Sequence, residues 1–305
     1  SDLELMRFIP GPDLPGGAVI VGLDGVREAY LTGRGTFRMR ATTRIEQVTP
    51  RRKGIVVTEL PYGVGPERVI ERIKDLVSAK KLQGISDIVD LTDGEHGLRL
   101  VIEVAPSVNP EALLQELLRQ TPLEENFSIN AVALVDGQPR TLGLHELLDV
   151  FVRHRLDVVR RRSAYRRQRA SERLHLVDGL LIAIVDIDEV IELIRSSDDA
   201  TQARERLMSV FDLSQEQATY ILDMPLRRLT KFSRIELEAE REELRQTIDS
   251  LTEILENDER LRRLVADELL EIAEAHATPR RTVLLEGGTT PTRALSLEVE
   301  DDPCL

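Results

Sequence analysis

Arginine side chains crowd into residues 27–53, a stretch whose chemistry suits the binding of phosphate. The stretch holds eight basic residues against two acidic ones, a local balance of +6, although the 305-residue chain has a net charge of −13. A guanidinium donates paired hydrogen bonds to phosphate oxygens, and clustered positive charge attracts the backbone of duplex DNA. The tract therefore predicts a DNA contact, with a merely solvated basic strand face as the alternative.

Within this tract, the residue spacing predicts a strand that follows a glycine-containing turn. Over residues 36–42 apolar side chains alternate with Arg38 and Arg40, which places both arginines on one face of the strand. The preceding segment, Thr32-Gly33-Arg34-Gly35, predicts a turn. Its two glycines would let the backbone approach a ligand closely, with Arg34 at the tip of the turn.

A second basic tract, residues 153–173, carries nine arginines against two acids, a balance of +7. Its counterpart is the segment 234–276, with 14 acidic and six basic residues and a balance of −8. Helical segments of opposite charge can neutralise each other, so the second tract predicts an intramolecular contact rather than a DNA site.

No group of residues has the spacing of a catalytic centre or a metal site. The tyrosines lack a neighbouring base, and neither a nucleotide-binding loop nor a Ser/His/Asp set is present. The five histidines are scattered, and a single cysteine, Cys304, excludes a cysteine-based zinc site. Aromatic residues make up 3% of the chain, which argues against binding by base stacking. The tyrosines are Tyr30, Tyr62, Tyr165 and Tyr220.

Hydrophobic run length and cysteine usage point to a cytoplasmic protein. No apolar run reaches the roughly 18 residues that a membrane span needs, and the N-terminus does not read as a signal peptide. We therefore expect no membrane partner.

The elements that must position the first tract indicate an α+β domain. One helix is expected from Pro66 to before Gly84, and another from Asn109 to about Arg119. The expected order is β-β-α-β-β-α-β, followed by a turn at 136–139. The strands are expected at 36–42, 55–60, 85–91, 97–104 and 127–135.

After Leu144 the pattern becomes helical. A long helix is expected over 145–185, three shorter helices over 187–230, and a second long helix over 233–276. The second long helix has apolar residues at coiled-coil spacing, which predicts a long antiparallel two-helix coiled coil. The positions that carry this spacing are Leu244, Ile248, Leu251, Leu255, Val265, Leu269 and Ile272.

In an antiparallel pair, the start of the first long helix near 145 faces the end of the second near 276, so the numbers of facing residues sum to about 421. This register places the arginine-rich segment 160–169 opposite the acidic segment 252–261, and we expect their charges to fix the pairing.

The short helices would form a small head at the tip of this stalk. Its segment 221–229 is apolar, and a head of about 45 residues has little core of its own. Self-association through this segment is expected, while packing only inside the head is the alternative. The candidate dimer contacts are Ile221, Leu222, Met224, Leu226 and Leu229.

Five segments together resemble the A subunit of bacterial type IIA DNA topoisomerases, either DNA gyrase or topoisomerase IV. The similarity is collinear over about residues 1–285. The segments are Ile9 to Gly17 (IPGPDLPGG), Tyr30 to Gly35 (YLTGRG), Thr58 to Tyr62 (TELPY), Gly84 to Ser86 (GIS) and Ile221 to Leu229 (ILDMPLRRL).

The resemblance implies a domain order along the chain. The assigned parts are the end of a winged-helix domain (1–15), an α+β tower domain (16–143), coiled-coil helix 1 (144–186), a helical dimerisation head or C-gate (187–232), coiled-coil helix 2 (233–278), and a return segment with a linker toward a C-terminal domain (279–305).

The resemblance also implies a non-catalytic part of an ATP-dependent enzyme that cuts and reseals duplex DNA. The tower would contact the arms of the cut duplex, and the coiled coil and head would form a homodimeric exit gate. Mg²⁺ and ATP would bind a partner B subunit, and this chain would hold no cofactor. Localisation would be cytoplasmic, at the nucleoid. Charge and resemblance together make Gly33, Arg34, Gly35, Arg38, Arg40 and Arg44 the candidate DNA contacts. The competing hypothesis is a coiled-coil dimerisation scaffold without a DNA role.

Overall fold

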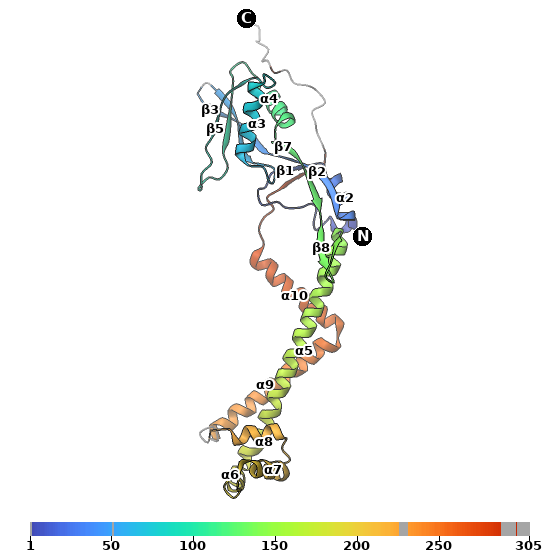
Figure 1. Cartoon of the computed structure of the whole chain (residues 1–305), viewed down its shortest axis with the longest axis vertical. Helices are drawn as coiled ribbons and strands as arrows, with labels where there is room; N and C mark the ends of the chain where they lie inside the picture. Colours follow the sequence, from blue (N-terminus) through green and yellow to red (C-terminus); the bar gives the residue numbers. More distant parts are fainter. Residues whose placement is uncertain (1, 51, 226–230, 288–296, 298–305) are drawn as a thin grey trace. The chain divides into compact units, whose positions relative to one another are not determined.

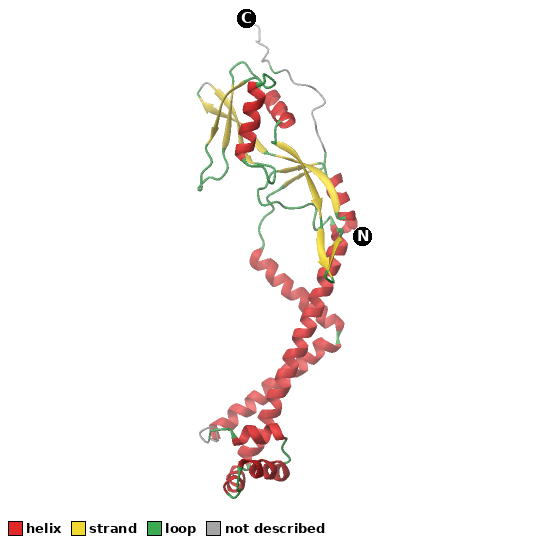
Figure 2. Ribbon diagram, viewed as in Figure 1, coloured by secondary structure: helices red, strands yellow, loops and turns green. Residues whose placement is uncertain are grey.

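The computed structural model describes residues 2–50, 52–225, 231–287 and 297, and it divides into two compact units (Figures 1 and 2). The first unit combines Ser1–Val150 with Thr278–Leu305, and the second is Phe151–Ala277. The first unit contains the strands, and the second is helical. A mixed α+β region followed by a helical region confirms the coarse fold class expected from the sequence.

One four-stranded sheet of the first unit holds the basic strand β2 (Arg34–Arg40). The strand order is β10-β1-β2-β7, with β1 (Val19–Val21) parallel to β10 (Val283–Leu285) and the other pairs antiparallel. β7 (Glu124–Asn130) lies at the other side of β2. Helix α2 (Asp24–Thr32) packs on this sheet, and together they bury one core cluster formed by Ala18, Ile20, Leu23, Val26, Phe37 and Met39.

A second sheet carries the larger core of this unit. Its order is β3-β4-β6-β5, formed by β3 (Thr42–Thr49), β4 (Arg52–Glu59), β6 (Leu100–Val104) and β5 (Ile85–Asp90), all antiparallel. Helices α3 (Pro66–Ser78) and α4 (Pro110–Gln120) each begin with a proline, the position where a helix needs no backbone N–H. Their apolar residues pack against buried Ile55, Ile102 and Val104 of the sheet.

Several elements of the first unit differ from the sequence-based prediction. Strands β1 and β3 and helix α2 were not expected. The predicted strand 127–135 is two strands in different sheets, because the chain leaves β7 at Asn130 and enters β8 (Val132–Val135). β8 pairs with β9 (Gln138–Thr141) across Asp136 and Gly137, which both have positive φ, as a tight hairpin turn requires. A short helix, α1 (Asp2–Leu5), precedes these elements.

A strap formed by residues 278–285 binds the proline-rich connector 9–17. The backbone N–H of Leu14 donates to Thr282 Oγ1 (2.8 Å), and this hydroxyl, on a residue that is 1% exposed, donates to the carbonyl of Gly17 (3.1 Å). The backbone N–H of Thr282 donates to the Asp13 carboxylate, which holds the pKa of Asp13 below its ordinary value of 3.8. Arg280 donates to the carbonyl oxygens of Gly11 and Pro12. The strap ends as β10.

Helix α5 (Leu144–Val185), which provides the first helix of the second unit from Phe151 onward, is continuous, but the segment that opposes it is not. It consists of α9 (Lys231–Glu256) and α10 (Asp258–His276), so the prediction of one helix over 233–276 is wrong. Asn257 has an extended backbone, and its side chain accepts from the N–H groups of Glu259 and Arg260. Because these hydrogen bonds cap a new helix, the helix is interrupted at Asn257, although the apolar spacing resumes in the same register after it.

Near the start of α10, the contacts between α5 and the opposing segment agree with the antiparallel register expected from the sequence, whereas Arg173 and Glu240, which sum to 413, depart from it. Val159 packs with Leu261 and Val265 in one buried cluster, and Arg160 donates to Asp258 at 2.9 Å. These pairs lie within a few residues of the expected sum. Along the arginine-rich part of α5, small Ser163 and Ala170 occupy the buried positions, which explains the apparent gap in its apolar stripe.

Toward the end of α10, the predicted apolar seam is not observed. Ile272, expected in the apolar seam, is 51% exposed, whereas Val265 is buried. Near this end, Glu268 accepts from Arg155 (2.9 Å) and Arg162. The hydrogen bond from Arg162 is the main cause that holds the pKa of Glu268 below its ordinary value of 4.5.

Among the described residues, three short helices lie within the range 187–230, where the sequence predicted three. They are α6 (Ile187–Arg195), α7 (Ala200–Phe211) and α8 (Gln215–Leu222). Ser214 and Gln217 form a reciprocal capping box at the start of α8. The head also packs against α5 through Leu180 and Ala183. In the described ranges no helix combines the length and apolar composition that crossing a bilayer requires.

Candidate nucleic-acid interface

Strands β2 and β7 build one polar sheet face from residues that lie opposite each other. The antiparallel register pairs Arg34 with Asn130, Thr36 with Ser128, Arg38 with Asn126 and Arg40 with Glu124. Facing residues of an antiparallel pair point to the same side, so these eight side chains share a face. Phe37 and Met39 point into the core, which confirms the alternation expected from the sequence.

A carboxylate from β7 neutralises part of this face. Glu124 Oε2 accepts from Arg40 Nε at 2.6 Å, and Glu124 Oε1 accepts from Arg38 Nη1 at 3.3 Å. The Glu124 side chain is only 15% exposed, so its charge is screened poorly by solvent. This acidic partner of the basic tract lies 84 residues away in the sequence and is brought beside it by the pairing of β2 with β7.

Arg34 and Arg44 are the candidate arginines whose side chains stay available. Both are exposed, and within the described ranges neither takes part in an ion pair. Arg34 begins β2, whereas Arg44 lies on β3, in the other sheet of the same unit. The structure therefore separates the four candidate arginines into two available cations and two that share Glu124.

The two candidate glycines serve the fold rather than an open surface. Gly33 ends α2 with φ of 79°, and a Cβ there would lie 2.6 Å from the carbonyl oxygen of Leu142. A Cβ on Gly35 would lie 2.1 Å from the carbonyl oxygen of Gly25. The close approach that both glycines allow in this structure is to the chain's own backbone, and a contact of either glycine with DNA stays a prediction.

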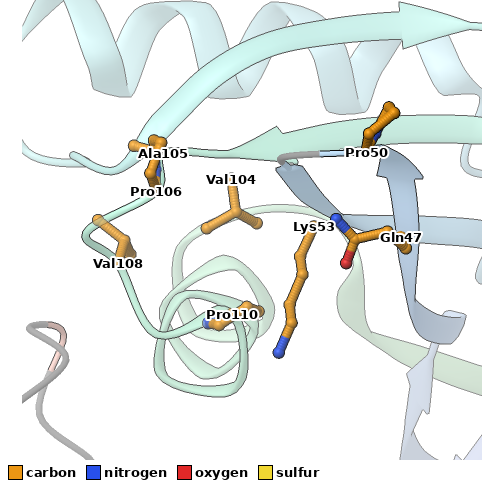
Figure 3. A pocket seen from close by; sticks show the side chains of 8 residues that line it. All are labelled: Gln47, Pro50, Lys53, Val104, Ala105, Pro106, Val108 and Pro110. Carbon is orange, nitrogen blue, oxygen red and sulfur yellow. The ribbon is translucent and has the colours of Figure 1, made fainter. Parts of the chain in front are cut away.

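A cavity of about 230 Å³ lies beside the β3–β4 hairpin and the start of α4 (Figure 3). Lys53 and Gln47 provide its polar side chains, and Val104, Val108 and Pro110 are among its apolar ones. No carboxylate, imidazole or thiol of the described residues lines it, so it lacks the groups for acid–base or nucleophilic chemistry.

Three of the tyrosines have side chains that take part in packing or hydrogen bonding within the fold, without a neighbouring base among the described residues. Burial raises the pKa of Tyr30, and Tyr62 packs edge-on against Phe127. Tyr220 Oη accepts from Arg173, which also donates two hydrogen bonds to Glu240 (2.6 and 2.9 Å). A charged guanidinium cannot accept a proton, so Arg173 cannot act as the base for Tyr220. Among the described residues, no acidic, histidine or cysteine cluster of three or more could hold a metal ion.

The candidate dimer contacts of the head divide into three groups. Ile221 is buried in the head's own core and also lines the cavity described next, and its assignment as a dimer contact stays a prediction. Leu222 and Met224 line an apolar cavity of about 170 Å³ between α5, α6 and α8. Leu226 and Leu229 lie outside the described residues.

Known proteins resemble this chain over most of its length. The family model for the A subunit of DNA gyrase/topoisomerase IV matches residues 1–270. The chain is 44% identical over 290 residues to the DNA gyrase A subunit of Synechocystis sp., covering 94% of the chain and 34% of that protein. The corresponding protein of Halalkalibacterium halodurans is 46% identical over 281 residues (92% and 34%), and that of Staphylococcus aureus 45% over 288 residues (94% and 32%). The chain thus spans about a third of the length of these relatives.

Proposed function

The chain belongs to the family of DNA gyrase and topoisomerase IV A subunits, and from that premise we propose that it is a non-catalytic part of the breakage-reunion subunit of a type II DNA topoisomerase. In this proposal its first unit, the tower, holds the arms of the cleaved duplex. Its second unit keeps two subunits joined while the other duplex passes.

The polar face of β2 and β7 is the observation that carries the DNA contact. It combines exposed Arg34 with arginines 38 and 40 on one sheet face, and Arg44 adds an available cation from the next strand. Such a face neutralises phosphates without reading bases, as contact with the arms of any duplex requires. We propose Arg34 and Arg44 as direct phosphate contacts, with Arg38 and Arg40 as contacts that Glu124 attenuates.

The helical unit would form the exit gate. The buried cluster of Val159, Leu261 and Val265 supports α5 and α10 as the two helices of a coiled-coil stalk. The apolar cavity beside Leu222 and Met224 supports the head as the site of homodimer contact. The expected domain boundaries, from the tower over 16–143 to the head over 187–232, belong to the same proposal.

The cutting chemistry would lie outside this chain. The proposal places the nucleophilic tyrosine in a winged-helix region that these residues do not include, and Mg²⁺ and ATP on a partner B subunit. The chain by itself should then neither cleave nor relax DNA. Its place in the cell would be the cytoplasm, at the nucleoid.

Duplex binding by the Arg34→Ala/Arg44→Ala variant tests the DNA role. We expect weaker binding across unrelated sequences and a salt slope, log K against log[salt], that is shallower by about 1.8, or about 0.9 for each lost phosphate contact. Arg119→Ala/Arg195→Ala, with the same charge change on α4 and α6, is the matched control. Equal slopes for wild type and the Arg34/Arg44 variant would refute the DNA contact.

The scaffold hypothesis is tested by the mass of the chain in solution. Light scattering should give a dimer of wild type, twice the 34.4 kDa of one chain, and a monomer for Met224→Asp. Dimerisation with no duplex binding would favour a coiled-coil scaffold. A monomeric wild type, or a dimer that tolerates Met224→Asp, would contradict dimerisation through the proposed face of the head.

A further inference from the structure

The polar face of the first sheet extends beyond its arginines onto β7. Asn126, Ser128 and Asn130 are all exposed and alternate with Phe127 and Ile129, which pack against the core. The register sets them opposite Arg38, Thr36 and Arg34. We call Thr36, Asn126, Ser128 and Asn130 the neutral strip.

The neutral strip has hydrogen-bonding capacity that the fold does not use. Thr36 and Ser128 bond to each other through their hydroxyls at 2.9 Å. The side chains of Asn126 and Asn130 make no hydrogen bond within the described residues. A packing role does not explain polar amides on this face, because the core lies on the opposite side of the sheet.

We propose that the neutral strip binds the sugar–phosphate backbone of duplex DNA through uncharged hydrogen bonds, beside the arginines of β2. This rests on the proposed DNA role of the first unit and adds a second class of contact to it. Asparagine, serine and threonine are frequent donors to phosphate and sugar oxygens, and such contacts fix the position of a duplex without reading its sequence.

The size and charge of the face fit this partner. Residues advance by about 3.4 Å along an antiparallel strand, so the seven residues from Arg34 to Arg40 cover roughly 20 Å. That length follows about six base pairs of a duplex, which rises about 3.4 Å per nucleotide of each strand. Glu124 is the one carboxylate among the eight facing side chains, and it lies at the end opposite Arg34.

Uncharged contacts leave a different signature from arginine contacts when salt is varied. An arginine that neutralises a phosphate releases counterions and steepens the salt slope, whereas a neutral hydrogen bond changes affinity equally at every salt concentration. The two classes can therefore be separated in one titration series.

The test measures fluorescence anisotropy of a labelled, mixed-sequence duplex with the full 305-residue chain over a salt series. For Asn126→Ala/Ser128→Ala/Asn130→Ala, we expect affinity to fall by about tenfold or more, with an unchanged slope. The matched control is Ser78→Ala/Gln83→Ala/Ser86→Ala, three exposed neutral residues near the second sheet, which should bind as wild type does. Equal affinity for the strip variant and this control would overturn the proposal.

A variant that is expected to bind more tightly is also needed, because a variant that fails to fold could only lose binding. Ser128→Lys places a cation in the centre of the strip and should tighten binding and steepen the slope by about 0.9. Ser86→Lys carries the same added charge on β5 and should change neither by as much. If the two lysine variants bind alike, duplex does not lie over the strip.

The outcomes also separate this inference from the proposed function. If wild type binds duplex through Arg34 and Arg44, but the strip variants bind it as tightly as wild type does, only the neutral strip is refuted. Wild type without salt-dependent duplex binding refutes both.

Discussion

Replacing Glu124 by glutamine should strengthen DNA binding, because Glu124 occupies two guanidinium groups that face the proposed duplex. Its carboxylate accepts from Arg40 at 2.6 Å and from Arg38 at 3.3 Å. The amide of Glu124→Gln keeps the shape of the side chain but removes its charge. The released arginines then add one or two phosphate contacts.

The size of the effect follows from counterion release. Each added contact steepens the slope of log K against log[salt] by about 0.9. At about 0.1 M salt this corresponds to binding about 8-fold tighter for one contact and about 60-fold tighter for two. Loss of the ion pairs should cost the fold no more than about 1 kcal/mol each, since both arginines are partly exposed.

Glu125→Gln is the matched control in the same anisotropy titration. Glu125 is the next residue on β7, but it points to the opposite face, where Arg68 donates to it at 2.6 and 3.0 Å. Both variants change the net charge by +1, so a long-range charge effect would be the same for the two. Equal salt slopes for Glu124→Gln and Glu125→Gln, or weaker binding by Glu124→Gln, would refute the reasoning.

Three further predictions concern the fold. Thr282→Val should lower the free energy of unfolding by about 1–3 kcal/mol in denaturant titration, because it leaves the N–H of Leu14 without its acceptor; Thr201→Val, on an exposed helix surface, should change it little. The pKa of Glu268 is lowered in the folded state, so its stabilisation is present above pH 4.5 and lost as the pH falls through the folded-state pKa; the melting temperatures of wild type and Glu268→Gln should differ at about pH 7 and converge in acid, and a constant difference would contradict this. Asn257→Ala should cost about 1 kcal/mol by removing the cap of α10, whereas Asn257→Asp should retain stability, and equal loss in both variants would argue against capping.

The sequence predicted the elements whose patterns are local. The alternation of Phe37 and Met39 with arginines identified β2, and the opposite charges of the two long helical segments predicted the contact region in which Arg160 meets Asp258. The helices that begin at Pro66 and Pro110 were also expected, because proline at the first helical position is a local signal.

Features that depend on distant partners were missed. β1 and β10 have three residues each and are stabilised by pairing between segments far apart in the chain, so neither carries a pattern of its own. β3 was missed because apolar and polar residues do not alternate regularly along it, and its apolar Ile45 is 37% exposed. Glu124 became part of the candidate site only through sheet pairing. The break at Asn257 did have a local signal, the sequence Asn257-Asp258-Glu259, but the apolar spacing on both sides concealed it.

The strap has a consequence for the order in which the chain is made. Leu14 and its acceptor Thr282 are separated by 268 residues, and the entire second unit is synthesised between them. At about 5–20 residues per second, the connector waits roughly 13–54 s for its partner to leave the ribosome. During that interval β1 has no β10 beside it, so the first sheet has an open edge in the nascent chain. The first unit is therefore completed after the second, although most of its residues are translated earlier.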